Sequence, residues 1–102
     1  MISEEIKPQA VNLSRQTLYA NDVNRTISLT KDAEPTAYTF TFNSSYRILL
    51  ATVNRAWPMS NWAGAMVTVN DISYSNNTVT VKLSTNSTQN YSVSVRALYY
   101  IV

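Results

Sequence analysis

The amino-acid sequence predicts an all-β protein, an antiparallel β-sandwich of about six strands. Several short segments alternate apolar and polar residues with period two, as strands with one buried face do. Turn-forming residues separate these segments at intervals of roughly eight to twelve residues, which is typical of a sandwich. No segment shows a sustained apolar period near 3.6 residues, so little helix is expected.

The chain divides near its N-terminus. Residues 1–16 are aperiodic and include Pro8, so we expect an N-terminal lead-in or tether there and a β-sandwich domain over residues 17–102. Regular alternation starts at residues 25–30, where isoleucine and leucine alternate with threonine and serine. The charged residues 31–35 then predict an exposed turn.

The middle of the chain predicts two strands and a long irregular segment. Residues 38–42 place aromatic side chains on one face and threonines on the other, and residues 43–45 form a turn. Residues 46–53 are almost continuously apolar, which predicts a strand buried on both faces. Residues 54–64 contain both tryptophans and the only glycine, and we expect an irregular loop there before strand character resumes at residues 65–69.

The C-terminal third predicts the remaining strands. Residues 71–74 continue the preceding strand after an irregularity, and the asparagine-rich residues 75–77 predict a hairpin turn. Residues 78–83 alternate strictly, residues 84–91 predict a polar loop, and residues 92–102 form the terminal strand.

The terminal strand is apolar on both faces near its end. One face carries a row of five apolar residues, Val93, Val95, Ala97, Tyr99 and Ile101. The opposite face carries Leu98, Tyr100 and Val102. A small sandwich has one core to fill, so this second face predicts a subunit interface. Arg96 shares that face, and we expect it to pair with an acid of a neighbouring subunit or to stack on Tyr100.

Composition excludes several functional classes. The 102 residues suit one domain and contain no cysteine and no histidine, so a disulfide framework, a thiolate site and the usual general base are absent. We see no facing carboxylate pair for glycosidic cleavage, and we expect no enzyme activity, no cofactor and no metal site. Eight basic residues are scattered among six acids, which disfavours nucleic-acid binding. No apolar run approaches the roughly 20 residues that cross a bilayer, so no membrane insertion is expected.

Three stretches resemble a known family. Residues 40–52 look like a short turn followed by a buried aliphatic strand, residues 66–74 look like the next strand, and residues 96–102 look like the terminal strand. Together they make residues 38–102 similar to the C-terminal receptor-binding domain of phage tail fibres, a trimer with the plan of H-type lectins. Leu98, Tyr99 and Tyr100 replace the tryptophan and glycine usual in that terminal strand. The resemblance implies a homotrimer at the tip of a virion fibre, acting outside the cell at the host surface.

Two segments are candidates for binding a host glycan. The irregular segment offers Asn54, Arg55, Trp57, Asn61 and Trp62, because indoles stack on sugar rings while arginine and asparagine bind hydroxyl groups. An equally supported interpretation is that a tryptophan plugs the open end of the sandwich or packs at a subunit interface.

The polar loop is the second candidate and offers Asn86 and Tyr91, although a solvated hairpin end is the more ordinary interpretation. The leading hypothesis is therefore a trimeric module that recognises a host receptor. The alternative hypothesis is a purely structural trimerisation or capping domain of a virion fibre.

Overall fold

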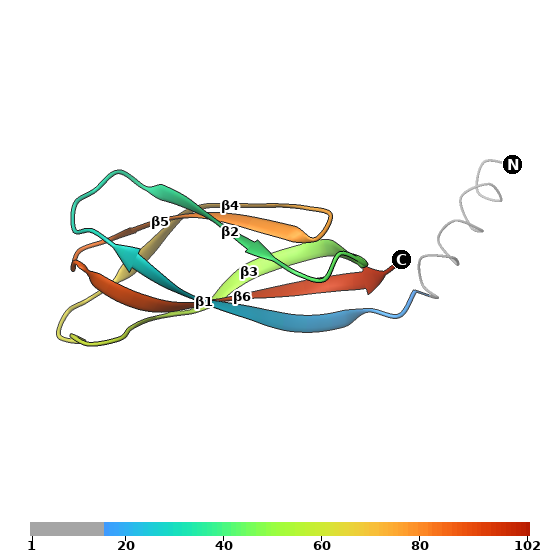
Figure 1. Cartoon of the computed structure of the whole chain (residues 1–102), viewed down its shortest axis with the longest axis horizontal. Coiled ribbons are helices and arrows are strands. Elements are labelled where there is room, and N and C mark those ends of the chain that lie inside the picture. Colours follow the sequence, from blue (N-terminus) through green and yellow to red (C-terminus); the bar gives the residue numbers. More distant parts are fainter. Residues whose placement is uncertain (1–15) are drawn as a thin grey trace, which may run out of the picture.

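Two three-stranded antiparallel sheets face each other in the structure, a computed structural model that describes residues 16–102 (Figure 1). Sheet A has the strand order β1-β6-β3, and sheet B has the order β2-β5-β4. The six strands are β1 (Tyr19–Leu29), β2 (Thr36–Thr41), β3 (Tyr46–Pro58), β4 (Val67–Ser75), β5 (Thr78–Thr85) and β6 (Gln89–Ile101). The predicted antiparallel β-sandwich of six strands is confirmed.

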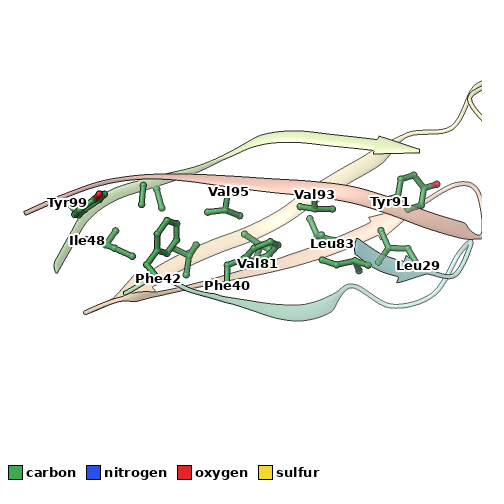
Figure 2. Close-up of a cluster of buried hydrophobic side chains, with 14 residues drawn as sticks. Leu29, Phe40, Phe42, Ile48, Val81, Leu83, Tyr91, Val93, Val95 and Tyr99 are labelled. Atoms are coloured by element: carbon green, nitrogen blue, oxygen red, sulfur yellow. The ribbon is translucent and has the colours of Figure 1, made fainter. Parts of the chain in front are cut away.

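The core lies between the two sheets and is built by period-two alternation. Val93, Val95 and Ala97 of β6 have no exposed surface. Figure 2 shows Val93 and Val95 facing Phe40 and Val81 of sheet B across the sandwich. The inward row predicted for the terminal strand is therefore correct up to Tyr99. Ile101, at the end of the same row, is 47% exposed.

β3 differs from its prediction in length and in burial. It continues to Pro58, past the expected boundary after residue 53, because β6 offers pairing partners as far as Tyr91. Register shifts between Ile48 and Leu50 and between Val53 and Arg55 accommodate an extra residue each. The prediction that residues 46–53 are buried on both faces is wrong, since Leu50 is 59% exposed on the face away from the core.

The ends of the other strands also depend on their partners. β1 starts at Tyr19 rather than near residue 25, because Tyr19 pairs with Tyr99 of β6. The predicted hairpin turn is correct: Ser75 pairs with Thr78, and Asn76 has a φ of 54°, which asparagine tolerates.

The predicted polar loop over residues 84–91 is much shorter in the structure. β5 ends at Thr85 and β6 begins at Gln89, so only residues 86–88 connect them. Tyr91 is fully buried, and its hydroxyl lies 2.5 Å from Thr85 Oγ1 and 2.6 Å from the carbonyl oxygen of Ser87. The prediction that Tyr91 contacts a ligand is therefore wrong, because the ring fills the core and the hydroxyl is used within the fold.

We expect Tyr91→Phe to lower the free energy of unfolding by about 1–3 kcal/mol, because the buried Thr85 and Ser87 oxygens lose a polar neighbour. Urea unfolding monitored by fluorescence measures the change. Tyr38→Phe is the matched control, since the Tyr38 hydroxyl donates to the carbonyl oxygen of Ser28 in an exposed position and its loss should cost less than about 0.5 kcal/mol. Equal losses in the two variants would contradict this account of the buried network.

Candidate functional site

The face of sheet A opposite the core, here called the outer face, collects most of the residues singled out by the sequence. Directly paired residues point to the same side of a sheet, so the strand register defines rows across β3, β6 and β1. Four successive rows are Trp57–Ser92–Thr26, Arg55–Ser94–Asn24, Thr52–Arg96–Asp22 and Leu50–Leu98–Ala20. The outer face therefore runs from an aromatic end, through a charged row, to an apolar end.

The apolar end of the outer face is an exposed patch. We call it the apolar patch and define it by Leu18, Leu49, Leu50, Leu98, Tyr100 and Val102. Leu18, Leu49 and Tyr100 line a hollow of about 430 Å³ together with Gln16. The structure thus brings the predicted interface residues Leu98 and Tyr100 together with three leucines that precede them in sequence.

An ion pair occupies the centre of the outer face. Arg96 Nε donates to Asp22 Oδ1 at 2.7 Å, and its Nη2 donates to Asp22 Oδ2 at 3.2 Å. Asn54 Nδ2 also donates to Asp22 Oδ2, at 3.3 Å. The hydrogen bond from Arg96 is the largest influence on Asp22 and holds the pKa of that carboxyl below its usual value. Arg96 therefore pairs within its own chain, which corrects the expectation that it pairs with a neighbouring subunit or stacks on Tyr100.

The aromatic end holds a group that we call the tryptophan cluster, Arg55, Trp57 and Trp62. The two indole centroids lie 6.0 Å apart with the rings tilted by 55°, and the Arg55 guanidinium carbon lies 4.5 Å from the Trp57 ring centroid. Trp57 is 51% exposed and Trp62 is 59% exposed. The interpretation in which a tryptophan plugs the open end of the sandwich is therefore wrong for both residues.

The remaining predicted binding residues shape the loop between β3 and β4. Asn61 Oδ1 accepts from the amide nitrogen of Ala63 at 3.3 Å. Asn86 accepts from the amide nitrogen of Met66 at 2.8 Å and donates to the carbonyl oxygen of Gly64 at 2.9 Å. Asn86 therefore uses both polar atoms of its side chain to position the loop, and Asn61 uses its side-chain oxygen.

Sequence reasoning missed two residues that organise the site. Gln89 Oε1 accepts from the backbone amide of Asn61 at 2.9 Å, and Gln89 Nε2 donates to the carbonyl oxygen of Asn61 at 2.6 Å, which fastens the loop that carries Trp62. The carboxylate of Asp22 accepts hydrogen bonds from the side chains of Arg96 and Asn54. Strand pairing was the available signal for Asp22, because the alternation of β1 and β6 places it opposite Arg96.

The described part of the chain offers a stacking and hydrogen-bonding surface. Over residues 16–102, no three side chains of His, Cys, Asp or Glu come together as a metal site would require. Within the same range, no helix has the length and apolar character needed to cross a membrane. Comparison with protein-family models, curated proteins and solved structures finds no match to this chain.

The Asp22–Arg96 pair predicts a contribution to stability that depends on pH. Because folding lowers the pKa of Asp22 from its ordinary value of 3.8, the carboxylate stabilises the fold above that value, and the contribution is lost as the pH falls through the folded-state pKa. We expect Asp22→Asn to reduce the loss of stability on acidification, measured by urea unfolding at neutral and acidic pH.

The control for this measurement is Glu34→Gln, which removes an exposed carboxylate that has no ion-pair partner in residues 16–102. It should leave the acid dependence of the wild type nearly unchanged. An identical acid dependence in the wild type and in Asp22→Asn would contradict the assignment.

Proposed function

We propose that this chain is the receptor-binding tip domain of a phage tail fibre, which assembles as a homotrimer and recognises a glycan on the host surface. The observation that carries the proposal is the division of the outer face into an apolar patch and a tryptophan cluster. The apolar patch would bind other copies of the same chain, and the tryptophan cluster would bind the ligand. The location that follows is the virion tip, outside the host cell.

The apolar patch supports assembly. Leucines from three segments lie together on it: Leu18 before β1 and Leu49 and Leu50 in β3 are exposed, and Leu98 in β6 is half-buried. Contiguous apolar surface of this kind on a small domain marks an interaction site. A second copy of the chain is the simplest partner because most of the patch is aliphatic. The resemblance to phage fibre tips favours three copies.

The tryptophan cluster supports glycan recognition. Two half-exposed indoles on one surface provide flat apolar faces for sugar rings, while the adjacent arginine donates hydrogen bonds. In a trimer the cluster is present three times, so weak individual sites combine into strong attachment to a repetitive cell surface.

A purely structural trimerisation or capping domain is the second candidate. It is favoured by the position of Trp57 in a row of the same face that carries the apolar patch. A neighbouring subunit that covers the whole outer face would bury Trp57 as well. The two candidates differ in whether the tryptophans remain exposed after assembly.

The assembly hypothesis predicts a mass near three times 11.5 kDa by light scattering or sedimentation of the purified chain. Tyr100→Asp should weaken the trimer strongly, because a charge buried at an interface without a partner costs several kcal/mol. Lys82→Asp, on the exposed face of sheet B, should leave the trimer intact. A monomer at micromolar concentration, or equal effects of the two substitutions, would contradict the assembly through this face.

The recognition hypothesis predicts that Trp57→Ala and Trp62→Ala each abolish adsorption to host cells while the trimer and its Tm stay nearly unchanged. A stacked aromatic residue contributes roughly 2 kcal/mol or more, which is more than tenfold in affinity per site. Quenching by iodide checks accessibility in the assembly. Tryptophan emission that resists iodide in the trimer, together with loss of the trimer in Trp57→Ala, would instead favour the structural candidate.

A further inference from the structure

The tryptophan cluster carries a positive charge that no ion pair within residues 16–102 neutralises. Arg55 makes no ion pair and no side-chain hydrogen bond with any other residue of 16–102. Asp22, the acid in the adjacent row of the outer face, already accepts two hydrogen bonds from Arg96 and one from Asn54. Asp22, Arg96 and Arg55 together leave this half of the outer face with one net positive charge.

Arg55 is held by packing instead of by an acid. Its guanidinium carbon lies 4.5 Å from the centroid of Trp57, and its Nε is buried without a hydrogen-bond partner. Within residues 16–102 the two terminal nitrogens of Arg55 have no hydrogen-bond partner either, and the residue is half-buried rather than buried. A guanidinium fixed on an indole in this way presents a planar set of donors suited to a carboxylate or to another oxyanion.

From this arrangement we propose that the glycan bound by the tryptophan cluster is acidic. An anionic substituent of the sugar binds the guanidinium of Arg55, and the ring that carries it stacks on an exposed indole of Trp57 or Trp62. This inference rests on the proposed function and names the chemical class of its ligand. The same anionic chemistry is found in uronic-acid carboxylates and in sugar sulfates, and both are included as probes.

The experiment measures binding of the full chain to alginate, to dextran sulfate and to unmodified dextran at one ionic strength. We expect the wild type to bind at least one of the two acidic polymers about tenfold or more tightly than dextran. Arg55→Gln should remove that preference, and Arg55→Lys should keep part of it because the charge remains.

Arg25→Gln is the matched control. Arg25 also lies over an aromatic ring, 5.5 Å from the centroid of Phe40, but it donates to the carbonyl oxygen of Thr39 and lies outside the tryptophan cluster. Its replacement changes the net charge by the same amount, so binding that depends on overall charge alone would fall equally in both arginine variants. That result would overturn the inference, whereas a loss confined to Arg55→Gln would support it.

The outcomes separate this inference from the proposed function. Binding to alginate alone or to dextran sulfate alone supports the inference and identifies the anion. Equal binding to dextran and to the acidic polymers, lost in Trp57→Ala but kept in Arg55→Gln, overturns the inference and leaves glycan recognition standing. A stable trimer that binds none of the three polymers overturns both the inference and the recognition half of the proposed function.

Discussion

Pairing of β6 on both of its edges is the interaction on which the rest of the structure depends. β6 is the central strand of sheet A and is paired along its length with β1 on one side and with β3 on the other. Because side chains alternate along β6, this pairing determines which residues enter the core and which lie on the outer face. Its inward row supplies the largest set of fully buried core residues, and its outward row fixes which residues of β1 and β3 share the outer face.

The sequence predicts most of what is local to one strand and little of what depends on a partner. Alternation alone predicts the sandwich, the inward row of β6 and the turn at Asn76. It fails at Tyr91, which reads as part of a polar loop among serines and asparagines, because only pairing with Pro58 and Ile27 draws it into the core. The length of β3 is missed for the same reason.

In the candidate site, too, the features that are local in sequence could be predicted and those that depend on strand pairing could not. Arg55, Trp57 and Trp62 are close in sequence, so their grouping follows from their spacing even though the first two lie on a strand and only the third lies in a loop. Asp22 and Gln89 act on this region from distant positions. Neither has a local pattern that marks it, because its role exists only once β6 is paired with β1 on one edge and with β3 on the other.

The ion pair at the centre of the outer face bears on how far an assembly contact extends. Asp22 and Arg96 satisfy each other within one chain, so neither needs a partner from a second subunit. Covering them would remove both charges from water, and the cost of desolvation often exceeds the gain from attraction. Covering the leucines is favourable because it removes apolar surface from water. In the assembly proposed above, a contact that stops at the Asp22–Arg96 row is therefore favoured over one that covers the whole face, and such a contact would leave the tryptophan cluster exposed.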